Sequence, residues 1–116
     1  MNSRDVVLVK TLLETIDEIE QYLKDYNCTT FEFFDSEKIL KRAVTMCMIS
    51  VSELVDNLSD EFREEHPEIN FRRFKTLRNI AAHKYGAINF EILWETINHN
   101  LPDYKRQFEE ILREGR

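Results

Sequence analysis

The 116-residue sequence contains very little glycine and proline, with two residues of each. Folds built from many short strands need frequent turns, which depend heavily on these two residues, so their scarcity argues against a β-sandwich or β-barrel. The longest mostly apolar run, residues 43–51, is far shorter than the roughly 20 residues that cross a bilayer. At this length we expect a single domain, residues 1–116, whose core needs no metal or disulfide crosslink.

Cysteine is also scarce, and acidic residues outnumber basic ones. Cys28 and Cys47 have no CxxC spacing and are too few for a disulfide scaffold, which favours reduced thiols in a cytoplasmic protein. The first residues do not resemble a signal peptide, and no His, Cys, Asp and Glu grouping has metal-ligand spacing, so we expect no metal and no cofactor. With 22 acidic and 16 basic residues, the formal net charge of −6 excludes a protein that coats polyanions non-specifically.

Apolar residues recur at spacings of three and four in four segments, which predicts four helices. The first covers about residues 5–26, the second 39–58, the third 71–83 and the fourth 90–112. Side chains that can bind free backbone N–H groups stand before three of them, and these predicted caps are Asn2 or Ser3, Asp35 or Ser36, and Asn89.

The connections are short. Residues 27–35 include three phenylalanines and are expected to form a loop or short turn packed onto the core. Residues 59–66 are expected to form either a frayed extension or a separate turn ended by Pro67. Pro102 is expected to bend the last helix, because it lacks a backbone N–H. The predicted fold is therefore an all-α, antiparallel four-helix up-and-down bundle. The apolar arc of the second helix is wide enough for more than one neighbour, and a second chain is one candidate.

Positive charge is concentrated in residues 71–85, which contain five cations and no acidic residue. These cations are Arg72, Arg73, Lys75, Arg78 and Lys84. In a chain of net negative charge, such a cluster is a candidate contact for RNA phosphates. It can equally be a solvated helix face that pairs with acidic residues of the first two helices.

Arg78, Asn79, His83 and Tyr85 combine side chains that suit metal-independent RNA cleavage. Histidine can transfer protons near neutral pH, arginine can bind a phosphate through two parallel N–H bonds, and the ribose 2′-hydroxyl can act as the nucleophile. At 100° per residue, Arg78 and His83 diverge by about 140° around an ideal helix. A site that uses both needs a distorted helix or the same residues from a second copy, as in a C2 dimer with a composite cleft. Alternatively, the histidine is a helix-end residue and the tyrosine a packing residue.

Residues 78–85, Arg-Asn-Ile-Ala-Ala-His-Lys-Tyr, resemble the signature of the HEPN superfamily. The resemblance is specifically to HepT-like toxins that pair with minimal nucleotidyltransferases, whose signature is an arginine, four to six residues, a histidine, any residue and a tyrosine. Residues 4–5, 66–71 and 93–102 look like the flanking segments of this family, so the similarity covers nearly the whole chain.

The resemblance implies a homodimeric helical bundle with a ribonuclease site at the dimer interface and RNA, with tRNA as one candidate, as substrate. Arg78 and His83 would be catalytic, and Asn79 would support the site. Tyr85 would be the regulatory position, because in this family the nucleotidyltransferase antitoxin transfers AMP from ATP to the tyrosine of the motif. The added anion would occupy and neutralise the cationic cleft.

Two other classes of function are consistent with the sequence. One is a non-catalytic helical partner that docks on the nucleotidyltransferase, and the other is a structural dimerisation bundle. Toxicity that depends on Arg78 and His83 would separate the nuclease from the non-catalytic partner. RNA affinity that falls steeply with added salt would separate the nuclease from the structural dimerisation bundle.

Overall fold

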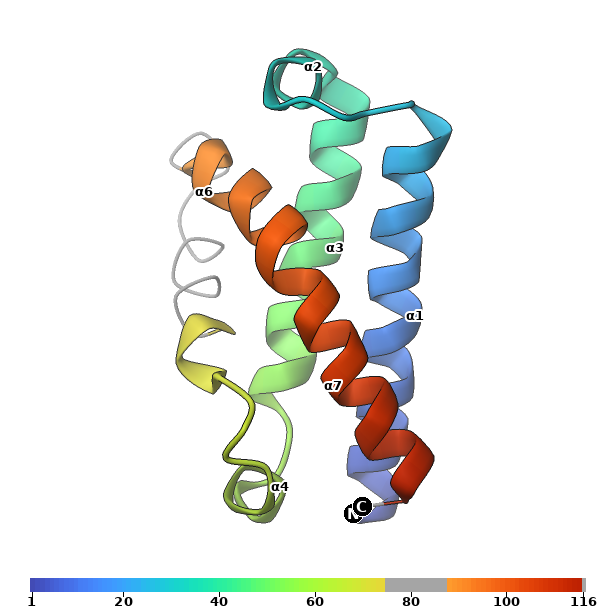
Figure 1. Ribbon diagram of the computed structural model, residues 1–116, viewed down its shortest axis with the longest axis vertical. Helices are drawn as coiled ribbons and strands as arrows, with labels where there is room; N and C mark the ends of the chain where they lie inside the picture. The colour runs from blue at the N-terminus through green and yellow to red at the C-terminus, as the bar shows by residue number, and fades with distance from the viewer. Residues whose placement is uncertain (75–87, 116) are drawn as a thin grey trace.

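The computed structural model describes residues 1–74 and 88–115, and within these ranges all regular structure is helical, as predicted (Figure 1). A further helical turn covers residues 71–74, so the third predicted helix begins where expected, whereas its remainder and Gly86 lie outside the described residues. The elements are α1 (Ser3–Asp25), α2 (Phe31–Ser36), α3 (Lys38–Asp56), α4 (Asp60–Glu65), α6 (Phe90–Glu95), the π-helical turn η2 (Thr96–Asn100) and α7 (Leu101–Glu114).

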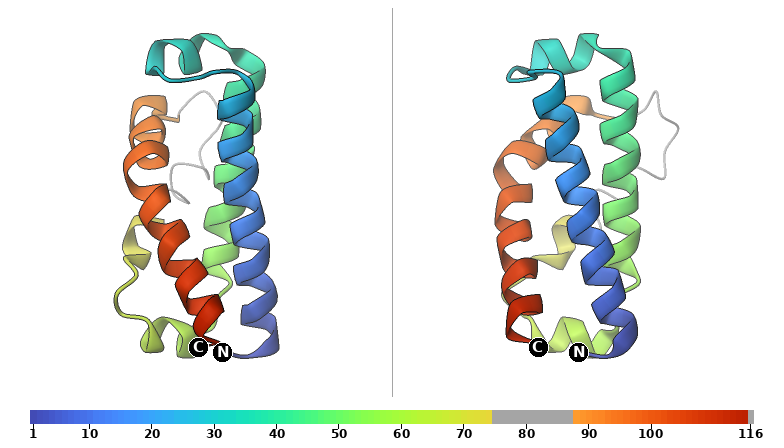
Figure 2. Two further views of the ribbon diagram at one scale, coloured as in Figure 1. Left: turned by 45° about the vertical axis from the view of Figure 1, so that its right-hand side comes forward. Right: turned by 90° about the vertical axis from the view of Figure 1, so that its right-hand side faces the viewer.

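The long helices form an antiparallel bundle. α1 packs against α3, which returns in the opposite direction, and against α7, which crosses the pair obliquely (Figures 1 and 2). The short helix α2 covers one end of the bundle, and α4 lies at the other end, near both termini. Among the described residues, no helix is both long enough and apolar enough to cross a membrane.

The core is formed by the apolar stripes that the sequence predicts, together with aromatic residues from the short helices. Phe34 of α2, Phe62 of α4 and Phe108 of α7 are fully buried, and the rings of Phe62 and Phe108 stack at a centroid distance of 6.3 Å. The stripe of α1 is buried as expected, at Val9, Leu12, Ile16 and Ile19. The wide arc of α3 is only partly covered within one chain, because Ile39 and Met46 are 70% and 61% exposed.

The first turn of α1 fastens this helix to the start of α4. Asn2 caps α1 by accepting a hydrogen bond from the Asp5 backbone N–H at 2.7 Å. The buried Asp5 carboxylate accepts hydrogen bonds from the Ser59 backbone N–H at 3.1 Å and from the Ser59 hydroxyl at 2.6 Å. The same hydroxyl caps α4 by accepting from the Phe62 backbone N–H. Asp60–Glu65 therefore form a separate helix, with Ser59 and His66 as its cap residues and Pro67 directly after it.

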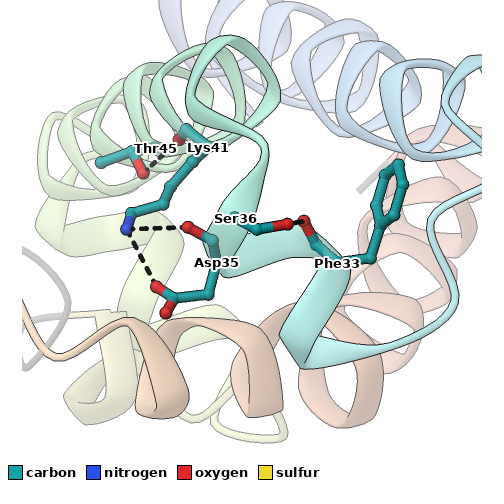
Figure 3. A network of polar contacts seen from close by, with 5 residues as sticks. All are labelled: Phe33, Asp35, Ser36, Lys41 and Thr45. Carbon is teal, nitrogen blue, oxygen red and sulfur yellow. Dashed lines mark hydrogen bonds and ion pairs between the residues drawn. The ribbon is translucent and has the colours of Figure 1, made fainter.

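Two predictions about the first connection, residues 27–35, are wrong, although its expected packing onto the core is confirmed by the buried Phe34. Residues 31–36 form helix α2 rather than a loop, because the Thr30 hydroxyl caps its start by accepting from the Phe33 backbone N–H. Neither Asp35 nor Ser36 caps α3, since both belong to α2. The Asp35 carboxylate instead binds the Lys41 ammonium at 2.9 Å (Figure 3). The cap position is occupied by Glu37, whose side chain makes no capping hydrogen bond.

The last helix is interrupted at Pro102, as predicted, but the interruption is a π-helical turn. Asn89 caps α6 by accepting from the Ile92 backbone N–H at 3.1 Å, and η2 follows directly after α6. At the end of this turn the Leu101 backbone N–H reaches back five residues to the Thr96 carbonyl. Proline removes one helical donor and crowds the carbonyl four residues earlier, and the wider turn accommodates both effects.

Candidate functional site

Most of the site residues that the sequence predicts lie outside the described residues. These are Lys75, Arg78, Asn79, His83, Lys84 and Tyr85. The described chain instead shows how the two flanks of this segment are held, at residues 71–74 and 88–90. Arg72 and Arg73 are the predicted RNA-binding residues that lie within it.

Arg72 and Arg73 contact different parts of the bundle. Arg72 lines a cavity of about 360 Å³ that is bordered by the last turn of α3, by Arg63 of α4 and by Phe71 and Phe74. Arg73 lies toward the last helix, where its guanidinium donates a hydrogen bond to the Asn100 side-chain oxygen at 3.2 Å. Both side chains are exposed, but the structure does not bring the two guanidinium groups to one pocket.

The N-terminal flank of the predicted site is held by aromatic packing on α7. Phe74 is 2% exposed, and its ring lies 4.2 Å from the ring of Tyr104, measured between centroids. The Tyr104 hydroxyl donates to the Asn70 carbonyl at 3.2 Å, which ties the chain before the helical turn to the same side chain. Burial raises the pKa of Tyr104, and the nearby Arg73 partly opposes this effect. The hydroxyl therefore stays protonated and able to donate at neutral pH.

A cation also holds this flank to the end of α3. The Arg63 guanidinium lies over the ring of Phe71, 5.0 Å from its centroid. Its Nη2 donates to the carbonyls of Val55 at 2.8 Å and Asp56 at 3.2 Å, which belong to the last turn of α3. Arg63 therefore adds side-chain donors to the carbonyls of the last turn of α3, and its charge opposes the negative end of the helix dipole.

The C-terminal flank, residues 88–90, is held by a second cation–π contact. The Lys41 ammonium lies 4.2 Å from the ring centroid of Phe90, the first residue of α6. It also binds the Asp35 carboxylate at 2.9 Å and the Asp35 carbonyl at 3.3 Å (Figure 3). The Lys41 side chain is 18% exposed and the Asp35 side chain is 49% exposed, so the lysine is the more shielded member of this ion pair. Ile88, directly before the cap residue of α6, is buried.

The remaining titratable groups form no second reactive centre within the described ranges. Burial raises the pKa of the Cys47 thiol to about 11 and also raises the pKa of Cys28, so both thiols are protonated at neutral pH. His66 is 1% exposed, packs on Phe62 and binds the Glu68 carboxylate through Nδ1 at 3.1 Å. No cluster of His, Cys, Asp and Glu suited to a metal ion occurs among the described residues.

Residues 12–111 match the family model of HepT-like ribonucleases. The chain belongs to the HepT-like ribonuclease family. The match covers the segment between the two flanks described above. It also confirms the family and the all-helical fold that the sequence predicts.

Relatives in other organisms cover almost the same length. A candidate RNase of Methanocaldococcus jannaschii is 29% identical over 98% of this chain and 97% of its own. A candidate RNase of Caldanaerobacter subterraneus subsp. tengcongensis is 32% identical over 84% of this chain and 88% of its own. A third, from Thermococcus cleftensis and named as a candidate ribonuclease HepT, is 27% identical over 89% of this chain and 91% of its own. No solved structure matches this chain at a significant level.

Proposed function

We propose that this protein is a toxin of the HepT type, a metal-independent endoribonuclease that acts on RNA, with tRNA as one candidate, in the cytoplasm. The observation that carries the proposal is the Arg-Asn-x-x-x-His-x-Tyr sequence at residues 78–85, within the range that matches the HepT-like ribonuclease family. Relatives that cover nearly the whole chain are named as candidate RNases, which supports the same class of activity.

In the proposed reaction, the ribose supplies the nucleophile and the protein supplies proton transfer and charge. The His83 imidazole accepts the proton of the 2′-hydroxyl, and the 2′-oxygen forms a bond to the adjacent phosphorus. The bond from phosphorus to the 5′-oxygen breaks, and a protonated imidazole returns a proton to that oxygen. Arg78 binds the non-bridging oxygens through two N–H bonds, which favours the transition state, where their negative charge increases. The products are a 2′,3′-cyclic phosphate and a 5′-hydroxyl.

The active form is proposed to be a homodimer in which the motifs of two copies face each other. Arg78 and His83 point about 140° apart on an ideal helix, so one helix does not direct both side chains at the same phosphate without distortion. A C2 pair of these segments allows the arginine of one copy to meet the histidine of the other. Asn79 would support the site, and a wider set of cations would bind the flanking phosphates, namely Arg72, Arg73, Lys75 and Lys84.

Regulation is proposed to act through Tyr85. A cognate minimal nucleotidyltransferase, serving as antitoxin, would transfer AMP from ATP to the tyrosine hydroxyl and release pyrophosphate. The added phosphodiester and nucleoside would fill the cleft and offset its positive charge, so RNA phosphates would no longer bind there.

The deciding experiment combines growth inhibition with RNA cleavage by the purified protein in excess EDTA. Arg78→Ala and His83→Ala are expected to abolish both effects while circular dichroism and the unfolding midpoint stay unchanged. If both variants remain as toxic and as active as the parent, the assignment of the site is wrong. A protein that never inhibits growth yet still binds its nucleotidyltransferase would instead be the non-catalytic helical partner.

A second measurement tests the regulatory residue. After incubation with the nucleotidyltransferase and ATP, intact mass is expected to increase by whole AMP units, and Tyr85→Phe is expected to remove this increase. A mass gain that persists in Tyr85→Phe would place the modification on another residue.

A further inference from the structure

We propose that Lys41 and Arg63 are positioning residues that fasten the two flanks of residues 75–87 to α3 through cation–π contacts with Phe90 and Phe71. This inference rests on the proposed nuclease function, because it assigns these side chains a role in the orientation of residues 78–85. Neither cation belongs to the positive cluster of residues 71–85 that the sequence singles out.

The two contacts have the same form and lie at opposite ends of one helix. At one end, the Lys41 ammonium is 4.2 Å from the ring centroid of Phe90, three positions after residue 87. At the other, the Arg63 guanidinium is 5.0 Å from the ring centroid of Phe71, four positions before residue 75. A cation within about 6 Å of a ring centroid is attracted by the negative face of the aromatic ring.

Each cation is itself held in place at α3, so its contact with a ring fixes the position of that ring relative to this helix. Lys41 belongs to α3, and the Asp35 carboxylate at 2.9 Å holds its ammonium in place. Arg63 donates two hydrogen bonds to the carbonyls of Val55 and Asp56 at the other end of the same helix. The aromatic rings are therefore placed relative to α3, which is the longest described helix that both flanks contact.

Chain length alone does not provide this placement. Fourteen residues separate Lys41 from Val55, which corresponds to about 21 Å along a helix. The thirteen residues 75–87 reach up to about 43 Å when extended, roughly twice that spacing. Fixed points at both flanks are thus needed to set where residues 78–85 lie relative to α3. Catalysis is sensitive to such placement, because a shift of about 1 Å in a reacting group can lower a rate a hundredfold.

The test is single-turnover cleavage of unfractionated tRNA by the full chain, with tRNA affinity measured separately by anisotropy. Lys41→Met keeps the length and apolar stem of the side chain but removes its charge. We expect its maximal cleavage rate to fall about tenfold while the tRNA affinity changes less than twofold. Lys41→Arg keeps a cation over the ring and is expected to restore most of the rate. Phe90→Leu is expected to reproduce the loss of cleavage rate, and it replaces Lys41→Met in the test if that variant does not fold.

Lys105→Met is the matched control. Lys105 is also an ion-paired lysine of the bundle, bound to Asp17 at 3.0 Å and Glu20 at 2.7 Å, but these ion pairs join α7 to α1. Its loss is expected to lower the unfolding midpoint without changing the maximal cleavage rate. An equal loss of rate in Lys105→Met, or an unchanged rate in folded Lys41→Met, would overturn the positioning role.

Hydrogen exchange separates this proposal from the proposed nuclease function. We expect amides within residues 75–87 to exchange about tenfold faster in Lys41→Met than in Lys105→Met, and this readout does not depend on activity. If the unmodified protein cleaves no RNA, the nuclease function fails and the catalytic role of the contacts fails with it. If it cleaves RNA while the two variants exchange and react alike, only the positioning role fails.

Discussion

Replacement of Asp5 by alanine is expected to destabilise the protein more than any other single loss of charge at the start of α1. The Asp5 carboxylate is 2% exposed and accepts two hydrogen bonds from Ser59, one from its backbone N–H at 3.1 Å and one from its hydroxyl at 2.6 Å. Alanine leaves this buried backbone donor without a partner. It also removes the direct link between the start of α1 and Ser59, the residue that caps α4.

The magnitude follows from the number and kind of bonds. A hydrogen bond to a charged group contributes about 1.5–3 kcal/mol, and removal of the carboxylate also relieves the cost of burying a charge. We therefore expect Asp5→Ala to lower the free energy of unfolding by about 2–4 kcal/mol, a large part of the roughly 5–15 kcal/mol typical of a domain. For a domain near 100 residues this corresponds to a decrease of about 10 °C in Tm. Asp5→Asn keeps one acceptor oxygen and should cost about half as much.

The assay is urea unfolding of Asp5→Ala, Ser59→Ala and the double variant. Ser59→Ala removes the hydroxyl bond and the cap of α4, while its backbone N–H can still donate to Asp5. If the two residues act through their contact, the cycle should yield a coupling energy of about 1–2 kcal/mol. Additive effects, with a coupling energy below about 0.5 kcal/mol, would show that this buried contact contributes little stability and would refute the reasoning.

Three further outcomes follow from the described contacts. Alkylation of Cys47 at pH 8 is expected to be about a hundredfold slower than that of a free thiol, because a pKa near 11 leaves little thiolate, and Cys28 is also expected to react more slowly than a free thiol; rapid labelling of Cys47 in the folded protein would contradict this. Phe108→Ala should lower the free energy of unfolding by about 3–5 kcal/mol in urea titrations, because this fully buried ring stacks on another. Hydrogen bonds to α1 carboxylates raise the pKa of Lys105, so its contribution to stability should be complete below about pH 10 and decline above it, with Lys105→Met lacking this decline.

The long helices could be predicted from the sequence because most of their apolar residues, spaced three and four apart, lie on the face of the helix that is buried. The first helix was expected over about residues 5–26 and is observed over Ser3–Asp25, and its cap, Asn2, is one of the two residues proposed. The Asn89 cap was also predicted correctly. These features depend on residues within one turn of each other, so local physics decides them.

The errors occur where distant contacts override the local pattern. The Asp35 carboxylate could accept hydrogen bonds from the first N–H groups of α3. In the structure it forms an ion pair with Lys41, and the Asp35 backbone belongs to α2. Phe34 packs onto the core as expected, but its burial also stabilises a six-residue helix that would not be stable alone. His66 gives no local signal, and its position under Phe62 depends on the packing of α4 against α7.

The same distinction applies to the candidate site. The motif at residues 78–85 can be read directly, since its chemistry depends on residue types at fixed spacing. The side chains that hold its flanks cannot, because Lys41 lies 49 positions before Phe90 in the sequence. The buried Asp5 contact extends this dependence further, since Ser59 caps the helix that carries Arg63. If Arg63 holds the first flank as we propose, Asp5→Ala should speed hydrogen exchange near Phe71 more than near Phe90. Equal acceleration at both flanks would mean that the bundle responds as a whole, and that α4 has no separate role in placing the motif.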